Sequence, residues 1–377
     1  MSQSVTLENS SDSDGAESGG HEFHRPDPRE IVAHLADEAA GLDQSARVDL
    51  LERLLGKSIC RRLGIFRFPP GFVLSVVIPV YNEHATIAEV VRRVRASGVP
   101  TEIIIVDDGS TDGTWEWVRA QPGVVPIRTE NWGKDWAVQT AMALARGQFV
   151  RFLDSDDWLT PHANPEQFEL ARQTGADIVV AGYEDHDDDT GERRVLDWGD
   201  CDDFIAQQLG EGWASHYSAF LFRRELIQDI PHRQDFALRD DRMFMLEVAL
   251  RKPRLAIYRK PGFAHRRHSG ERLQRTTGFR RDLACWTFIA IFRKVLAMLE
   301  ARKELTMRRK RAAIATVWAH IRAFAKTYPD EAAEIVDWIY RLDPEFRPPV
   351  RPTLALAYKT LGFARTERLL KLRAALK

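Results

Sequence analysis

Residues 74–83, Leu-Ser-Val-Val-Ile-Pro-Val-Tyr-Asn-Glu, decide the fold of this 377-residue chain. Their β-branched and apolar part, Ser75–Val80, predicts a strand that is buried on both faces. A helix with an apolar stripe from Ile87 to Val94 follows, and Thr86-x-x-Glu89 predicts a capping box at its start. A buried strand followed directly by an amphipathic helix is the unit from which parallel sheets are built.

The same alternation continues to about residue 153. Further strands are predicted at Glu102–Val106, Val124–Arg128 and Phe149–Leu153, and further helices at Thr114–Ala120 and Trp136–Arg146. This order predicts an α/β fold with right-handed crossovers and a doubly wound, mainly parallel sheet that carries helices on both faces. Ligands bind such sheets beyond the carboxyl ends of the strands, so the residues just after each strand are the candidate site.

The two flanks of this region differ from it in composition. Residues 1–24, rich in Ser, Gly, Asp and Glu, predict a disordered tail, and helical spacing within 25–70 predicts an N-terminal helical extension. Residues 276–377 predict a basic helical C-terminal region. Residues 251–377 hold 30 Lys and Arg against 11 Asp and Glu, a net charge of +19, whereas the rest of the chain carries −20. This asymmetry favours an anionic partner about as strongly as it favours solvated helix faces.

No segment predicts export or a membrane span. The longest nearly apolar stretch, Ala284–Phe292, is much shorter than the roughly 20 residues of a spanning helix, and no secretory signal is visible. The three cysteines are widely spaced and odd in number, which is typical of reduced thiols. We therefore expect a cytoplasmic protein, and the basic runs Arg308–Arg311 and Arg365–Lys377 favour peripheral contact with an anionic membrane at its inner face.

Polar residues follow the first two strands. Tyr81 offers a face on which a nucleobase could stack, and the carboxylate of Asp108 could accept from a base imide N–H. For either motif alone, an ordinary strand-to-helix turn is the favoured interpretation. The run from Asp108 to Gly113 also imitates an EF-hand loop, but the twelfth position is Arg119 where calcium requires Glu, which excludes that reading.

An aspartate cluster, Asp154-Ser155-Asp156-Asp157, closes the fourth predicted strand. Because residues i and i+2 of a strand face the same side, Asp154 and Asp156 are expected to converge. Two carboxylates on one face are how proteins hold Mg²⁺ or Mn²⁺ against a diphosphate. The weaker alternative is an N-cap cluster for a helix near Pro161–Leu170.

Asp240 and Asp241 begin another helical stretch. Either residue could serve as the N-cap, or one of them could be a general base whose pKa is raised by its neighbour and which takes a proton from an acceptor hydroxyl. The sequence alone leaves both interpretations open.

Charged residues elsewhere give weaker signals. The basic loop His265–His268 could contact phosphates or supply a metal-ligating imidazole. Lys134 could meet a phosphate, although a solvated lysine at a helix start is slightly favoured. The acidic run Glu184–Asp189 predicts a solvated hairpin loop without chemistry of its own.

Taken together, the motifs resemble the family 2 glycosyltransferases, whose catalytic domain has the GT-A fold with a doubly wound mixed sheet. The resemblance covers about residues 72–270, which sets the predicted catalytic domain at 71–275. It is carried in order by Leu74-Ser-Val-Val-Ile-Pro-Val-Tyr-Asn-Glu83, Val106-Asp-Asp-Gly-Ser-Thr-Asp-Gly-Thr114, Asn131-x-Gly-Lys134 and Phe152-Leu-Asp-Ser-Asp-Asp157.

The resemblance implies a site for a nucleotide-sugar donor. Tyr81 would stack on the nucleobase, Asp108 would hydrogen-bond it, and Asp154 would lie near the ribose. The remaining residues expected to bind the donor are Pro79, Glu83, Lys134 and Ser155.

The resemblance also implies metal and base residues. Asp156 would be the direct metal ligand of the D-x-D pair, and His268 would close over the diphosphate and reach the metal. Asp241 resembles the Asp of the family's Glu-Asp helix start, which is the base of an inverting displacement. Asp240 stands where Glu is usual and could be aligned as the base instead.

The expected function is a metal-dependent, inverting glycosyltransferase of the hexosyltransferase type that uses Mg²⁺ or Mn²⁺ in cell-surface polysaccharide or glycolipid synthesis. It would move one sugar from a nucleoside-diphosphate donor to a glycan or lipid-linked acceptor hydroxyl, because the Gln-x-x-Arg-Trp signature of processive synthases is missing. The alternative is a non-catalytic scaffold that binds a nucleotide or glycan. Nucleotidyltransferases and dinucleotide-binding dehydrogenases are disfavoured, because no glycine-rich loop follows the first strand.

Overall fold

The computed structural model describes residues 41–63, 65, 71–212, 216–232, 239–268 and 277–375. The chain divides into two compact units, Met1–Phe68 and Pro69–Lys377. In the first unit, α2 (Gln44–Leu55) and α3 (Lys57–Arg62) lie within the range predicted to be helical. Asp43 caps α2, since its side chain accepts from the backbone N–H of Ala46 at 2.8 Å. The predicted tail, 1–24, lies outside the described residues.

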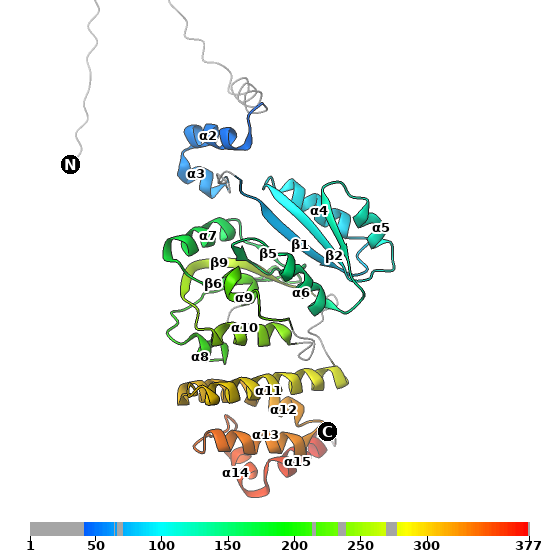
Figure 1. The fold of residues 1–377 in the computed structure, drawn as a ribbon. Coiled ribbons are helices and arrows are strands. Elements are labelled where there is room, and N and C mark those ends of the chain that lie inside the picture. The colour runs from blue at the N-terminus through cyan, green and yellow to red at the C-terminus, as the bar shows by residue number, and fades with distance from the viewer. Residues whose placement is uncertain are drawn as a thin grey trace, which may run out of the picture. The chain divides into compact units, whose positions relative to one another are not determined.

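The second unit begins with a parallel three-stranded sheet in the order β1 (Leu74–Val80), β2 (Thr101–Asp107), β3 (Val124–Arg128). Two helices, α4 (Ile87–Ala96) and α5 (Thr114–Arg119), cover one face and pack on Ile103 and Ile105 of β2 (Figure 1). The alternate residues of β2 point to the other face, where α6 (Lys134–Leu144) contacts β1 and β2. The predicted β-α-β-α-β order is confirmed, because its apolar periods are strong and local.

The predicted capping box of α4 is wrong. Thr86 is the N-cap, but its hydroxyl bonds back to Glu83 and not to a helix N–H. The carboxylate of Glu89 is held by Arg92 and Arg93, with N···O distances of 2.6 and 2.7 Å. Arginines three and four residues further along the helix therefore take the carboxylate that the capping box requires.

The prediction of a fourth strand at Phe149–Leu153 in the parallel sheet is wrong in the length of the strand and in the sheet to which it belongs. β4 spans only Phe149–Val150 and pairs antiparallel with β8 (Leu221–Arg223) in a second, mixed sheet. That sheet has the order β4-β8-β6-β9-β5, and β7 pairs with β6. Residues 151–157 are thus freed from strand pairing and can form a turn. The remaining strands are β5 (Trp158–Leu159), β6 (Ile178–Asp187), β7 (Arg193–Leu196) and β9 (Leu255–Arg267).

The acidic run Glu184–Asp189 is not the predicted solvated loop. Its first four residues continue β6, which pairs with β7 and, in parallel, with the basic end of β9. Asp185 lies 3.1 Å from His265 Nδ1 and 3.1 Å from Arg267 Nε, and Asp188 pairs with Arg266 at 2.5 Å. The carboxylates therefore neutralise the basic loop that the sequence offered as a phosphate contact.

Helices complete the second unit. The second sheet, α10 (Asp240–Leu250), α11 (Gly278–Ala301), α12 (Met307–Phe324) and α13 (Pro329–Leu342) share one hydrophobic core, to which Phe222, Phe292 and Val317 belong. The unit also contains α7 (Ala163–Thr174), α8 (Phe204–Gln208), α9 (Arg224–Ile227), a 3₁₀ turn at Tyr217–Ala219, α14 (Pro352–Leu361) and α15 (Phe363–Ala375). Across the described ranges, no helix combines the length and apolarity needed to cross a membrane.

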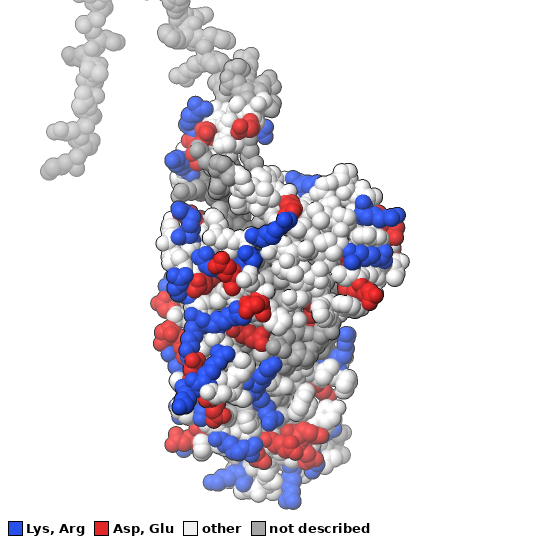
Figure 2. Space-filling view, viewed as in Figure 1, with Lys and Arg blue, Asp and Glu red and all other residues white. Residues whose placement is uncertain are grey.

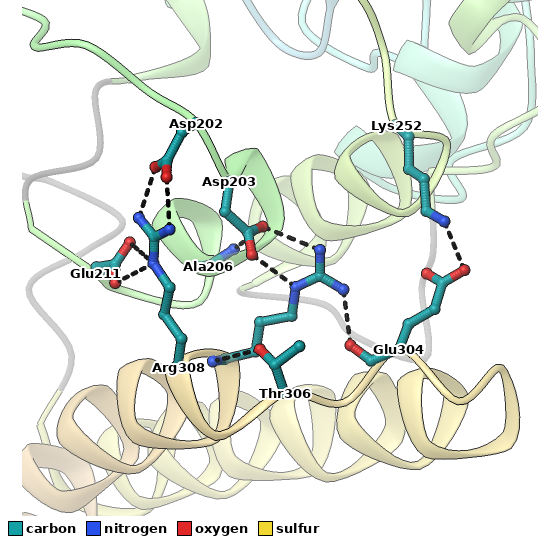
Figure 3. A network of polar contacts seen from close by, with 9 residues as sticks. Asp202, Asp203, Ala206, Glu211, Lys252, Glu304, Thr306 and Arg308 are labelled. Atoms are coloured by element: carbon teal, nitrogen blue, oxygen red, sulfur yellow. Dashed lines mark hydrogen bonds and ion pairs between the residues drawn. The ribbon is translucent and has the colours of Figure 1, made fainter.

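The start of α12 is tied to the segment before and after α8 by a network of ion pairs (Figure 3). Arg308 binds both oxygens of Asp202 and also contacts Glu211, and Arg309 pairs with Asp203 at 2.9 Å. Asp203 in turn caps α8 by accepting from the N–H of Ala206 at 3.0 Å. Arg308 and Arg309 therefore use much of their hydrogen-bonding capacity in contacts within the protein, and the sequence-based expectation that this run faces a membrane stays a prediction.

Candidate active site

The loops after β1 and β2 are joined by hydrogen bonds. The N–H groups of Asn82 and Glu83 donate to Ser110 Oγ and Thr114 Oγ1 at 2.8 and 2.9 Å, and the N–H of Thr111 donates to Asn82 Oδ1 at 2.9 Å. Asn82 has a φ of 54°, a left-handed conformation that Asn tolerates better than most residues. These bonds fix the carboxyl ends of the two strands as one surface.

Asp108 lies under this surface and organises the loop before α6. It is 4% exposed and accepts from the backbone N–H groups of Trp132 and Gly133 at 3.1 and 2.9 Å. Sequence reasoning gave Asp108 a nucleobase contact, and the structure adds this supporting role. Tyr81 is 47% exposed, so its ring is free to stack on a planar ligand. Pro79, Glu83 and Ser155 are exposed as well.

Asp154–Asp157 form a turn, in which the N–H of Asp157 donates to the carbonyl of Asp154 at 3.1 Å. We call this segment the aspartate turn. The carboxylates of Asp154 and Asp157 converge here. The predicted convergence of Asp154 and Asp156 depends on a strand that ends at Val150, so that geometric reason for it does not apply. The N-cap of α7 is His162, which excludes the interpretation of the aspartates as its cap.

A third group joins these two carboxylates from a distant part of the chain. Ligand atoms of Asp154, Asp157 and His216 all lie within 4.8 Å of one another. Asp156 is close by, with its Oδ2 3.5 Å from Nε2 of His268. The predicted metal residues Asp156 and His268 are thus brought together, while Asp157 and His216, which the sequence analysis missed, complete a tighter set. No local signal could reveal His216, since about sixty residues separate it from the turn.

The electrostatics of this cluster suit a divalent cation. Burial, and then the charges of Asp156 and Asp154, raise the pKa of Asp157 to about 6. Burial lowers the pKa of His216, so its imidazole is neutral and can act as a ligand. Oxygen donors with one imidazole are a donor set that Mg²⁺ or Mn²⁺ accepts, and a bound cation would relieve the repulsion among the carboxylates.

Lys134, the first residue of α6, contacts the aspartate turn. Its Nζ lies 3.8 Å from Asp154 Oδ1, and its side chain is 60% exposed. Lys134 is therefore both solvated and directed at the turn, so a phosphate held there would lie within its reach.

Asp240 and Asp241 differ in their surroundings. Asp240 Oδ2 lies 3.2 Å from Nδ1 of His232, whose side chain is 3% exposed. Asp135, at the start of α6, hydrogen-bonds Asp240, and burial followed by the charge of Asp240 raises the pKa of Asp135 to about 6. Asp241 is exposed, and its Oδ1 accepts from the N–H of Arg242 at 2.7 Å.

Neither aspartate caps α10, because Arg239 is the N-cap and makes no side-chain cap bond. A carboxyl with a raised pKa that the sequence analysis did not consider, Asp135, lies beside this pair. Asp135 lies about a hundred residues before the pair, and only its unusual place after Lys134 could have marked it. His232 is likewise a residue that the sequence analysis missed.

Comparison with known proteins bears on this arrangement. Residues 75–231 match the family model described as Glycosyl transferase family 2. The chain is 35% identical over 172 residues to the undecaprenyl-phosphate 4-deoxy-4-formamido-L-arabinose transferase of Pseudomonas paraeruginosa, which covers 42% of this chain and 49% of that protein. It is 28% identical over 259 residues to the putative glycosyltransferase EpsH of Bacillus subtilis, which covers 62% of this chain and 72% of EpsH.

A solved structure is similar in fold. The crystal structure of S. aureus TarS 1–349 in complex with UDP-GlcNAc superposes with a TM-score of 0.55 at 18% sequence identity, and the match covers 81% of this chain and 92% of that one. Residues 75–231 are therefore similar to family 2 glycosyltransferases, and the α/β body has the fold of the TarS structure. It spans about half the length of the arabinose transferase that it matches.

Proposed function

We propose that this enzyme transfers a single sugar from a nucleoside-diphosphate donor to an acceptor hydroxyl in cell-surface glycan synthesis, with inversion at the anomeric carbon. The proposal rests on one observation above all: the aspartate turn and Asp241 both lie close enough to the segment His216–Tyr217 for their charges to act on it. The charges of Asp154 and Asp241 both act on His216, and both raise the pKa of its buried neighbour Tyr217. A donor diphosphate at the turn would therefore place its sugar near Asp241.

The donor half of the site would use exposed groups at the strand ends. Tyr81 would stack on the base, Asp108 would position the loop carrying Lys134, and Lys134 would meet a phosphate. Asp154, Asp157 and His216, with Asp156 and His268 beside them, would hold Mg²⁺ or Mn²⁺. Such a cation, when bound, supplies charge neutralisation at the departing diphosphate. TarS was crystallised with UDP-GlcNAc, which supports a nucleotide-sugar donor here.

The base that we assign is Asp241. The carboxylate of Asp240 is committed to a nearly buried imidazole and to Asp135, and a carboxylate with both neighbours in place is poorly suited to receive a proton from a substrate. Asp241 is exposed and begins the same helix. Asp240, His232 and Asp135 are then positioning residues that join α10 to α6.

The proposed function is tested by calorimetric titration of UDP, GDP and dTDP, each with and without Mn²⁺. One of the three should bind, and its affinity should depend on the metal, because the aspartate turn alone repels a diphosphate. If none of the three binds with the metal present, the donor site is absent, and the non-catalytic scaffold becomes the better interpretation.

We also propose peripheral contact with an anionic membrane on the cytoplasmic side, through α14 and α15. Residues 351–373 carry six Lys and Arg, all exposed, of which Arg368 pairs with Asp330. The one acid among them, Glu367, is buried. Figure 2 shows Lys and Arg side chains at the end where Figure 1 places these helices. The exposed leucines among them are Leu356, Leu361, Leu369 and Leu372. Cations interleaved with leucines favour an anionic lipid surface.

Liposome flotation tests this contact. Wild-type protein should float with vesicles of phosphatidylcholine plus phosphatidylglycerol and not with phosphatidylcholine alone. Lys371→Glu should weaken partitioning by about 30-fold, since each cation near an anionic surface contributes about 1 kcal/mol and the substitution reverses one. Arg119→Glu, an equal change at an exposed site on α5, is the matched control. Equal flotation of the two variants, or equal recovery with both lipids, would remove the membrane contact.

A further inference from the structure

Arg242, directly after the proposed base, forms no ion pair with any of the residues that the structure describes. Its guanidinium is surrounded by protein, and desolvation is the main reason that its pKa is lowered. Its side chain makes one hydrogen bond, from Nη1 to the carbonyl of Gln208 at 3.3 Å, and no carboxylate of the described residues forms an ion pair with it. The residue as a whole is partly exposed, and Nε and Nη2 of its guanidinium make no hydrogen bond to the described residues.

The charge of a second arginine, Arg239, acts on Arg242, and within the described ranges Arg239 forms no ion pair. Arg239 has a buried Nε without a hydrogen-bond partner, and its charge is one of the causes that lower the pKa of Arg242. After burial, the charges of both arginines lower the pKa of His320 on α12. Both guanidinium groups therefore act on the same imidazole, which offers them no negative charge.

Gln208 adds a neutral donor to this pair. Its side-chain Nε2 is buried without a partner, and its backbone carbonyl is the group that Arg242 contacts. The negative charge of Asp241 acts on Arg242 and opposes the lowering of its pKa. Among the described residues, donors without a hydrogen-bond partner are thus found on Arg239, Arg242 and Gln208. Both arginines lie within two positions of the proposed base in sequence, and Gln208 contacts Arg242.

Placing these two guanidinium groups close together without an anion lowers the stability of the unliganded protein. Removing a cation from water without pairing it costs several kcal/mol in effective terms, and a like charge beside it adds to that cost. Guanidinium groups present planar pairs of N–H donors that match the oxygens of a phosphate better than a single carboxylate oxygen does. An anion with several oxygens would satisfy the donors and neutralise both charges.

We propose that Arg239, Arg242 and the side-chain amide of Gln208 form a subsite for a phosphate ester of the acceptor, next to Asp241. The assignment to the acceptor rests on the proposed function, because Asp241 marks the acceptor side of the site. The donor diphosphate would be held at the aspartate turn, so the two phosphate sites are separate. An acceptor with a phosphate near its reacting hydroxyl would gain both binding and orientation from the subsite.

The subsite is tested by thermal unfolding of the full chain with inorganic phosphate, in the presence of Mg²⁺ and a saturating concentration of whichever of UDP, GDP and dTDP binds, so that the donor site is occupied. Phosphate should raise the Tm of the wild type by about 3–5 °C at saturation, measured against chloride of equal ionic strength. Arg242→Met should lose this response. Without phosphate, its Tm should equal or exceed that of the wild type, because an unpaired charge has been removed.

The matched control is Arg251→Met, at the other end of α10, where the guanidinium is paired with both oxygens of Asp229 at 2.6 and 3.0 Å. This variant should keep the full phosphate response. If Arg242→Met fails to fold, Arg239→Gln provides the same comparison. A wild type that does not respond to phosphate, or a full response in either subsite variant, would overturn the subsite.

Failure of the subsite and failure of the donor site are distinguishable. Calorimetric binding of that same nucleotide with Mg²⁺ should be unchanged in Arg242→Met, since this residue lies outside the donor site. Two further ligands show whether the phosphate belongs to a lipid or to a soluble acceptor. Glycerol 3-phosphate is a phosphate ester without a lipid chain, and a short-chain prenyl phosphate carries an apolar chain. A stronger Tm response to the prenyl phosphate assigns the phosphate to a lipid headgroup, and an equal response assigns it to a soluble or polymeric acceptor.

Discussion

Asp241→Asn should lower the rate of sugar transfer by about 10²–10⁴-fold, because general-base catalysis by a positioned carboxylate contributes that much. The substitution keeps the size of the side chain and removes its ability to take a proton. Donor affinity should not change, since Asp241 lies on the acceptor side. The measurement is the release of nucleoside diphosphate in the presence of a cell-envelope acceptor preparation, together with calorimetric binding of the nucleotide.

Asp240→Asn is the matched control for this prediction. Its carboxylate is held by His232 at 3.2 Å and by Asp135, so an amide should weaken the link between α10 and α6 and lower the rate by about tenfold. If Asp240→Asn loses more activity than Asp241→Asn, the two roles must be exchanged. If both variants keep full activity, neither aspartate is the base.

Asp157→Asn should remove most of the metal dependence of nucleotide binding. In the wild type, Mn²⁺ should strengthen nucleotide binding by about 10²-fold or more, and loss of one charged ligand should reduce this gain at least tenfold. Binding without metal should improve slightly in the variant, because one negative charge that repels the diphosphate is gone. Calorimetric titration with and without Mn²⁺ measures both effects.

Asp156→Asn separates the two candidate ligand sets. In the structure, Asp157 groups with Asp154 and His216, whereas Asp156 faces His268. If Asp156→Asn abolishes the effect of Mn²⁺ and Asp157→Asn leaves it intact, then Asp156 is the direct ligand, as the family resemblance implies. Asp229→Asn, an exposed acid remote from the turn in sequence, controls for a general effect of lost charge.

The sequence predicts those parts of the fold and site that depend on local patterns. The first three strands and the helices between them carry apolar periods that need no distant partner, and their polar ends are visible at once. The length of β4 is not set by a local pattern. Its apolar residues favour a longer strand, but pairing with β8, about seventy residues further on, decides that it ends at Val150.

The site is only partly predictable for the same reason. The aspartates are evident in the sequence, but the turn that makes Asp157 converge with Asp154 depends on where β4 ends. His216 and His232 reach the site through tertiary packing, and nothing in their neighbouring residues marks them. The acidic run of β6 failed as a predicted loop because its ion-pair partners stand on β9, some eighty residues away.

The second sheet and helices α11–α13 share one hydrophobic core, so the region matched by the family model does not contain its whole core. The family match ends at residue 231, whereas Phe292 and Val317, both fully buried, complete the same core from helices beyond it. A fragment that ended with the family match would therefore leave the apolar inner face of the second sheet without the helices that cover it.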